Sequence, residues 1–190
     1  MAEIREQIQK IKEELRLYMN GALSQSLRER GVRYKLVFGV ELPRLKEIAS
    51  RNEKNHDLAQ ALWKEDIREC RILAGLLQPV ETFYPEICDI WMDDMRNTEL
   101  ADFTCMNLFR NLPYASEKAF QWMASEDELT AYCGFRLMCH LLSRTGAELN
   151  PRSEAEFIDQ ADAAIHSGNP ALAEAALTAK SKLSQGEKIG

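Results

Sequence analysis

Apolar residues recur every three or four positions along almost the whole chain, which is the spacing of one face of an α-helix. The first segment is typical, because it sets five apolar residues on one side of a helix expected over residues 2–19: Ile4, Ile8, Ile11, Leu15 and Tyr18. No stretch shows the strict alternation of a β-strand. The pattern therefore predicts an all-α protein of about eleven short helices joined by short turns.

A glycine turn followed by a proline-started helix stands out in the first half of the chain. The sequence FGVELPRLKEIA, residues 38–49, places Gly39 where the chain turns tightly. It places Pro43 in the first helical turn, where the missing N–H of proline costs nothing. Leu45 and Ile48 then lie on the apolar face that this helix presents to its neighbours.

A second signal follows in LWKEDIRECRILAGLL, residues 62–77, where one helix ends at a charged turn and the next begins at once. We expect Asp66 to cap this next helix, with Glu69 as its capping-box partner three residues on. The helix is apolar over most of its girth, so it should lie inside an assembly of helices.

Helices that are apolar on one side alternate along the chain with helices that are mostly apolar, and this alternation predicts how they assemble. Each helix pair exposes an apolar edge that only the next pair can cover, as in helical-repeat proteins. We therefore predict a stack of antiparallel helix pairs of the HEAT type. It should form a single domain over residues 1–183, followed by a loose tail at 184–190. A closed helical bundle is the competing architecture.

The composition is that of an ordinary soluble globular protein, with 45% hydrophobic and 28% charged residues. No run approaches the roughly 18 apolar residues of a membrane span, and the N-terminal residues have no signal-peptide core. The five cysteines form no CxxC pair, and we expect core thiols in a reducing cytoplasm. The three histidines are far apart, which predicts no metal site, and no motif indicates a cofactor.

Charge is unevenly distributed between the two halves of the chain. Residues 1–80 hold 15 Lys and Arg against 12 Asp and Glu, a net charge of +3, whereas residues 81–190 hold 9 against 18, a net charge of −9. Nucleic-acid binders gain most of their affinity by neutralising phosphates, and only the first half offers positive charge for this. Seven residues are the candidates for phosphate contact: Arg28, Arg30, Arg33, Lys35, Arg44, Lys46 and Arg51. A solvated helix face is the alternative interpretation of the same residues.

The stretch FGVELPRLKEIA, together with LAQALWKEDIRECRILAGLL at residues 58–77, resembles the first repeats of the DNA alkylation repair family, the AlkD-like alkylpurine DNA glycosylases. The resemblance is specific over about residues 20–80 and rests on the rhythm of helices beyond them. It implies a right-handed superhelix of HEAT-like repeats whose basic groove holds duplex DNA. It also implies excision of cationic N3- or N7-alkylated purines.

In that family the work is done by a Trp and an Asp one helical turn apart, an Arg after a Trp on the next repeat, and another Trp near the C-terminus. Aromatic faces attract the cationic base, and a carboxylate supports the oxocarbenium-like sugar as the bond to the base breaks. The arginine grips the phosphate.

Carried onto this chain, the Asp position falls on Asp102 and the first Trp position on Thr98. On the next repeat Tyr132 falls on the Trp position, and Gly134 and Phe135 occupy the paired arginine positions. The nearby Arg136 is turned to another side of the helix, although a register two residues along would bring it there. The last Trp position falls on Ala163. Three of the four positions therefore carry residues that cannot do the family's chemistry. Asp102 is alternatively a structural acid that pairs with a helix end or an arginine.

Three functional hypotheses follow. In the first, the chain keeps the repeat scaffold of the family and binds duplex DNA but has lost base excision. In the second, it is a helical-repeat module for a protein or peptide partner, which its acidic second half favours. In the third, it is an active alkylpurine DNA glycosylase. The three tryptophans, Trp63, Trp91 and Trp122, lie at apolar helical positions, and we expect them in the core rather than stacked on a base.

Overall fold

The computed structural model describes residues 2–144 and 147–186, and every regular element within them is helical. The α-helices are α1 (Ala2–Leu17), α2 (Gly21–Glu29), α3 (Leu42–Ser50), α4 (His56–Trp63), α5 (Arg68–Leu77), α6 (Pro85–Asp93), α7 (Thr98–Asn107), α8 (Ala115–Met123), α9 (Glu128–Leu142), α10 (Pro151–Ile165) and α11 (Pro170–Gly186). Two 3₁₀ turns, η1 (Val80–Thr82) and η2 (Phe109–Asn111), complete the set. The prediction of an all-α protein is confirmed.

The chain divides into two compact units, residues 1–88 and 89–190, and α6 runs across the boundary between them. The single domain expected over residues 1–183 stays a prediction. At the C-terminus, α11 continues to Gly186, so residues 184–186 are helical although we expected them in a loose tail. Residues 187–190, the rest of that tail, lie outside the described residues.

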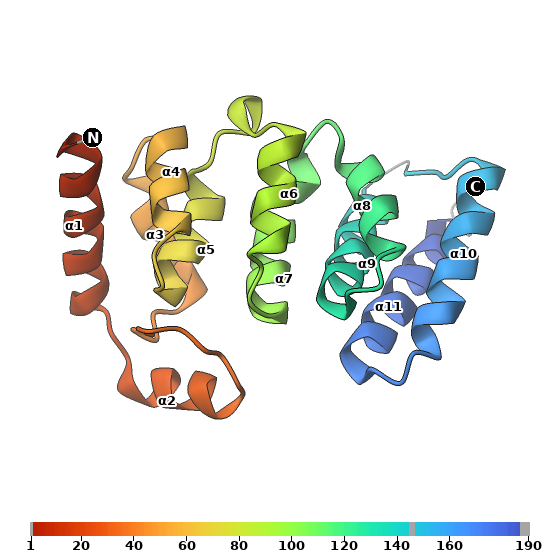
Figure 1. The fold of residues 1–190 in the computed structure, drawn as a ribbon, viewed down its shortest axis with the longest axis horizontal. Coiled ribbons are helices and arrows are strands. Elements are labelled where there is room, and N and C mark those ends of the chain that lie inside the picture. The colour runs from red at the N-terminus through yellow and green to blue at the C-terminus, as the bar shows by residue number, and fades with distance from the viewer. Residues whose placement is uncertain (1, 145–146, 187–190) are drawn as a thin grey trace. The chain divides into compact units, whose positions relative to one another are not determined.

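In the first unit, α4 and α5 pack against each other, α1 packs on α4, and α3 packs on α5. Figure 1 shows α2 lying crosswise to these helices. The apolar face of α1 buries Ile8, Ile11 and Leu15, as its spacing predicts. An ion pair between Lys12 and Glu65, with 2.8 Å between nitrogen and oxygen, ties α1 to the turn that follows α4.

The loop between α2 and α3 is held by a buried carboxylate. Glu69 is fully buried in the first turn of α5 and accepts hydrogen bonds from three backbone N–H groups, those of Phe38 at 3.0 Å, Gly39 at 2.9 Å and Val40 at 3.3 Å. The buried guanidinium of Arg68 donates to Glu69 at 2.9 Å and to the carbonyl of Val40 at 3.1 Å. A charged pair can be buried in this way because hydrogen bonds offset its loss of water.

This clamp corrects the expected start of α5. Glu69 turns its side chain to the loop and takes no part in a capping box, and the residue that precedes the helix, Ile67, makes no side-chain cap. Asp66 is therefore not the N-cap. Backbone contacts with the loop take its place, because Leu36 and Ile67 form a short parallel bridge in which the N–H of Arg68 donates to the carbonyl of Leu36 at 3.2 Å.

Gly39 is required where it stands. Its φ of +75° lies in the left-handed region, and an added Cβ would lie 2.2 Å from the backbone oxygen of Asn20. The same close approach lets the N–H of Asn20 donate to the carbonyl of Phe38 at 2.9 Å. The glycine turn predicted from the sequence is thus the place where the loop meets the start of α2.

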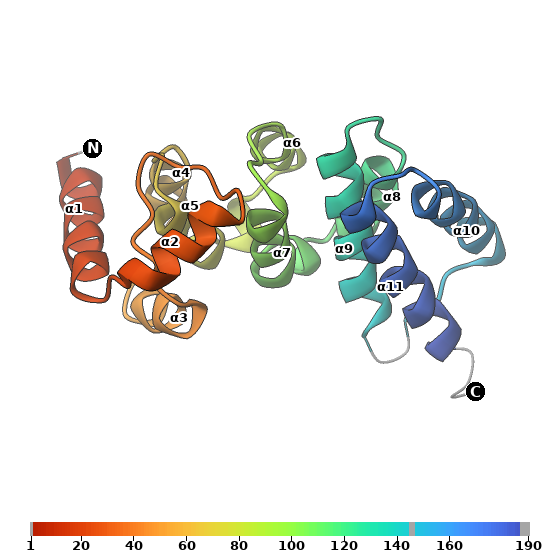
Figure 2. The ribbon, with the colours of Figure 1, turned by 90° about the horizontal axis from the view of Figure 1, so that it is seen from below.

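In the second unit α9 is the central helix, packed against α7, α8 and α11, while α10 packs on α11 (Figure 2). The tightest approach is at Gly134, where an added Cβ would lie 2.5 Å from the backbone nitrogen of Met123 on α8. Beside it, the rings of Phe109 and Trp122 pack with their centroids 5.2 Å apart. Gly134 is therefore a packing residue between α8 and α9.

The tryptophans and cysteines mostly behave as core residues. Trp63, Trp91 and Trp122 are all at most 3% exposed, which confirms their placement in the core. All five cysteines are free thiols, and Cys139 alone among them is not fully buried. In the part of the chain that the structure describes, no helix is long and apolar enough to span a membrane.

We predict that Glu69→Gln lowers the free energy of unfolding by about 3–5 kcal/mol, because the amide removes the buried negative charge that Arg68 faces. Urea denaturation followed by circular dichroism measures the change. Glu53→Gln, which removes an exposed carboxylate of the same unit, is the matched control and should stay within about 0.5 kcal/mol of the parent. Equal stability of the two variants would show that the clamp does not hold the loop.

Candidate functional site

Asp102 lies on α7, a helix whose start is fixed by Asn97, the side chain of which accepts a hydrogen bond from the N–H of Leu100 at 2.9 Å. Ala101 and Cys105 of α7 are fully buried, whereas the side chain of Asp102 is 34% exposed. The buried residues of α7 pack in the core, and the carboxylate of Asp102 lies at the edge of the core.

Two side chains of α9 reach this carboxylate from one helical turn apart. The hydroxyl of Tyr132 donates to Asp102, with distances of 3.0 Å to Oδ1 and 3.1 Å to Oδ2. The Nε of Arg136 donates to Oδ1 of Asp102 at 2.7 Å. Residues four apart on a helix lie on the same face, which is why both can meet one acceptor.

The position of Arg136 corrects an expectation from the sequence. We expected Gly134 to stand at the arginine position of the family and Arg136 to point elsewhere, but Arg136 is the residue that faces Asp102. Gly134 faces Met123 of α8 instead, where the helices are too close for any side chain. The register two residues along, which the sequence left open, agrees with this geometry.

These three residues line a cavity of about 350 Å³ together with Thr98 of α7 and three residues of α11: Ala171, Glu174 and Ala175. Ala163, onto which the last Trp position of the family falls, lies on α10 and lines a different cavity with residues such as Gln160 and Leu172. The wall opposite α7 and α9 is thus supplied by α11. An alanine-rich helix gives no sequence signal for such a role, so the contribution of α11 was missed.

The charges in this cavity shift the pKa values of its residues. Burial first, and then the negative charge and hydrogen bond of Asp102, raise the pKa of Tyr132 far above its ordinary value, so Tyr132 stays a hydrogen-bond donor. Burial acts to lower the pKa of Arg136, but the charge and hydrogen bond of Asp102 outweigh it and raise that pKa. Burial and the nearby positive charges of Arg110 and Arg136 lower the pKa of His140, one turn further along α9.

The seven basic candidates for phosphate contact all lie in the first unit, and six of them fall into two groups. Arg44 and Arg51 both form ion pairs with glutamates of the first unit. Arg44 pairs with Glu47, and Arg51 pairs with Glu14. Arg44 also lies over the ring of Tyr18, with the guanidinium carbon 4.2 Å from the ring centroid. Most of the charge of these two arginines is therefore compensated within the protein.

The other group follows the end of α2. Arg28 and Arg33 line a shallow cavity of about 480 Å³, and each donates to a backbone carbonyl, Arg28 to that of Tyr34 and Arg33 to that of Arg28. Arg30 and Lys35 are exposed nearby. Because carbonyls carry no net charge, the positive charge of this group is available to a phosphate. Lys46 is exposed on α3, apart from this group in the sequence.

Sequence and structure comparisons place the chain. Residues 8–182 match the family described as DNA alkylation repair enzymes. The chain belongs to that family. A search of curated proteins finds no match. A solved structure, described as belonging to "a new family of proteins related to the HEAT-like repeat DNA glycosylases with affinity for branched DNA structures", has the same fold, with a TM-score of 0.85.

That likeness covers 95% of this chain and 77% of the other at 20% identity, and it confirms the HEAT-like repeat fold of antiparallel helix pairs. The match to the DNA alkylation repair family covers residues 8–182, and so extends well beyond residues 20–80. Among the described residues no group of three or more His, Cys, Asp and Glu side chains could hold a metal ion.

We predict that Asp102→Asn lowers the pKa of Tyr132, because it removes the negative charge that opposes ionisation, although burial still raises that pKa. Ultraviolet absorbance of tyrosinate against pH measures the effect among the five tyrosines, and Tyr132→Phe identifies the late-titrating one. The folded pKa of Tyr132 exceeds its unfolded value of about 10, so its contribution to stability is complete below that pH and is lost as the pH rises beyond it. Identical titrations of parent and Asp102→Asn would contradict the pairing.

Proposed function

We propose that this member of the DNA alkylation repair family binds DNA through phosphate contacts and does not excise alkylated bases. The observation that carries the proposal is the state of Asp102, whose carboxylate accepts from both Tyr132 and Arg136 in a cavity otherwise lined by Thr98, alanines and Glu174. Asp102 and Arg136 supply an aspartate and an arginine, whereas Thr98 and Ala163 stand at the first and last tryptophan positions of the family.

Excision of a cationic base needs an aromatic face to receive it. A cation over an aromatic ring is stabilised by about 0.5–2 kcal/mol for each ring, and neither a threonine nor an alanine offers such a face. Tyr132 supplies the single aromatic ring among the described residues that line the cavity, and its hydroxyl is committed to Asp102. A cationic purine would therefore find little to hold it in place.

The carboxylate is also less suited to stabilising a developing positive charge on the sugar. Arg136 already neutralises Asp102 at 2.7 Å, so an oxocarbenium-like sugar would compete with a fixed guanidinium for the same charge. Electrostatic catalysis requires groups that are aimed at the charge that develops in the transition state. Here Asp102 is aimed at the protein's own cation.

DNA binding remains well supported by the same residues. Arg136 uses its Nε for Asp102, which leaves its terminal nitrogens for a phosphate, and its side chain is 29% exposed. The basic residues at the end of α2, whose cavity Glu29 also lines, add a second contact region. The structurally similar protein described as having affinity for branched DNA supports a preference for DNA with a branch point over linear duplex.

We predict that duplex DNA containing N7-methylguanine releases free base no faster in the presence of the protein than in its absence, as measured by mass spectrometry. Binding of the same duplex, followed by fluorescence anisotropy in the same preparation, shows that the protein used is folded and competent. Release of base that is abolished by Asp102→Asn would contradict the proposal and identify an active alkylpurine DNA glycosylase.

We predict salt-sensitive binding to labelled DNA, tighter for a four-way junction than for a linear duplex of the same length. Arg33→Gln with Lys35→Gln should lower the slope of log affinity against log salt by about 2, since about one counterion is released for each phosphate contact. Arg44→Gln with Arg51→Gln removes the same charge but should change the slope little, because Glu47 and Glu14 already hold those arginines. No binding at low salt, or equal effects of the two double variants, would contradict these assignments.

A further inference from the structure

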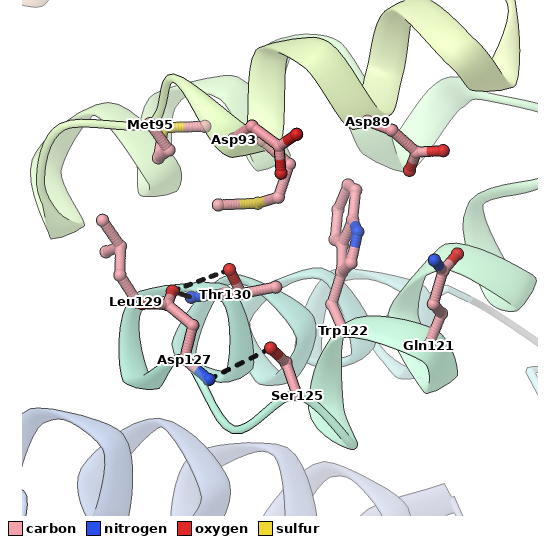
Figure 3. A pocket seen from close by; sticks show the side chains of 10 residues that line it. Asp89, Asp93, Met95, Gln121, Trp122, Ser125, Asp127, Leu129 and Thr130 are labelled. Carbon is pink, nitrogen blue, oxygen red and sulfur yellow. Dashed lines mark hydrogen bonds between the residues drawn. The ribbon is translucent and has the colours of Figure 1, made fainter.

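A second cavity of the unit formed by residues 89–190 is larger than the one at Asp102 and shares no lining residue with it. It has a volume of about 620 Å³ and lies among the end of α6, α8 and the start of α9 (Figure 3). Ten residues line it: Asp89, Met92, Asp93, Met95, Gln121, Trp122, Ser125, Asp127, Leu129 and Thr130. We call it the acidic pocket, because its charged lining residues are all aspartates.

The floor of the acidic pocket is apolar. Met92, Met95 and Trp122 are 5%, 8% and 3% exposed, and Leu129 is half-buried beside them. Figure 3 shows Trp122 rising from α8 towards α6, with Leu129 and Met95 at one side. Methionine side chains are flexible and polarizable, so such a floor adapts to apolar groups of different shape.

The three carboxylates of the rim differ in what they already bind. Asp89 accepts from Lys118 at 2.5 Å, and Asp127 caps α9 by accepting from the backbone N–H and the hydroxyl of Thr130 at 2.8 and 2.7 Å. Asp93 is exposed, and among the described residues it makes no hydrogen bond or ion pair. The pocket therefore presents one uncommitted carboxylate, and a second, on Asp89, that is about half exposed.

This lining restricts the class of occupant. A phosphate backbone would meet three carboxylates without a lining Lys or Arg, so nucleic acid is repelled. A wholly apolar group would leave the carboxylate of Asp93 without a counter-charge. A cation with an apolar stem would pair with the carboxylate at the rim and pack on the apolar floor. An arginine side chain has these two parts, since its methylene groups pack on apolar surface while its guanidinium reaches a carboxylate.

We propose that the acidic pocket docks an arginine of a partner protein, together with an adjacent apolar residue of that partner. The guanidinium pairs with Asp93 at the rim, and the apolar residue rests on Met92, Met95 and Leu129. The volume supports more than one side chain, because about 620 Å³ lies in the range of roughly 300–1,000 Å³ typical of pockets that enclose a whole ligand. The acidic rim then favours a positively charged segment of the partner.

The proposal does not depend on DNA binding, because the acidic pocket and the cavity at Asp102 have no residue in common. It assigns to the acidic part of the chain a partner of opposite charge. The net charge of −9 over residues 81–190 agrees with a positively charged partner.

The test uses a short labelled peptide in which one arginine stands between two leucines, and binding is followed by fluorescence anisotropy and by the methyl NMR signals of Met92 and Met95. We expect the peptide to bind and to shift both methyl signals. A matched peptide with citrulline, which keeps the shape of arginine without its charge, should bind at least about tenfold more weakly. A matched peptide with serines in place of the leucines should also lose affinity.

Asp93→Asn should weaken the arginine peptide about three- to tenfold, whereas Glu117→Gln, which removes the same charge from an exposed site of α8 outside the pocket, should leave binding unchanged. Unshifted methyl signals, or equal affinities for the arginine and citrulline peptides, would overturn the proposal. So would methyl shifts on addition of duplex DNA. A dimer of the chain alone that Asp93→Lys disperses would assign the pocket to a second copy and overturn a separate partner.

Discussion

The first unit depends on a single buried carboxylate. Glu69 accepts hydrogen bonds from three successive backbone N–H groups of the loop between α2 and α3, and Arg68 balances its charge. Without these bonds the loop would bury N–H groups with no acceptor, which costs about 1–3 kcal/mol for each. The glycine turn, the proline-started helix and the apolar helix α5 are therefore parts of one device. Together they hold the loop between α2 and α3 against the start of α5.

In the second unit a carboxylate is likewise bound by a neighbouring helix, because Tyr132 and Arg136 of α9 both donate to Asp102 on α7. Its hydrogen bonds are made within the protein. An ion pair that is about one-third exposed stabilises the fold only modestly. In the function we propose, the pair matters more for catalysis than for stability. A carboxylate that already has a cationic partner stabilises the developing positive charge of a sugar poorly.

The sequence predicted the helices well because apolar residues recur every three or four positions along most of them. Asn55 and Asn97 cap the starts of α4 and α7. It failed where one pattern serves two purposes. A Glu three residues after an Asp reads as a capping box, but local spacing does not reveal that Glu69 faces a loop 30 residues away. Likewise, Gly134 and Arg136 occupy one helix, and only the packing of α8 shows which of them can face Asp102.

Helix α9 divides its length between the two cavities. Asp127, Leu129 and Thr130 at its start line the acidic pocket, and Tyr132 and Arg136 one turn later line the cavity at Asp102. Since Gly134 brings the backbone of α9 against that of α8, these turns belong to one stiff pair of helices. Filling one cavity removes no contact from the other, so a basic protein and a nucleic acid could be carried at the same time. The chain would then act as an adaptor, with neighbouring turns of one helix serving partners that a single charged surface could not hold together.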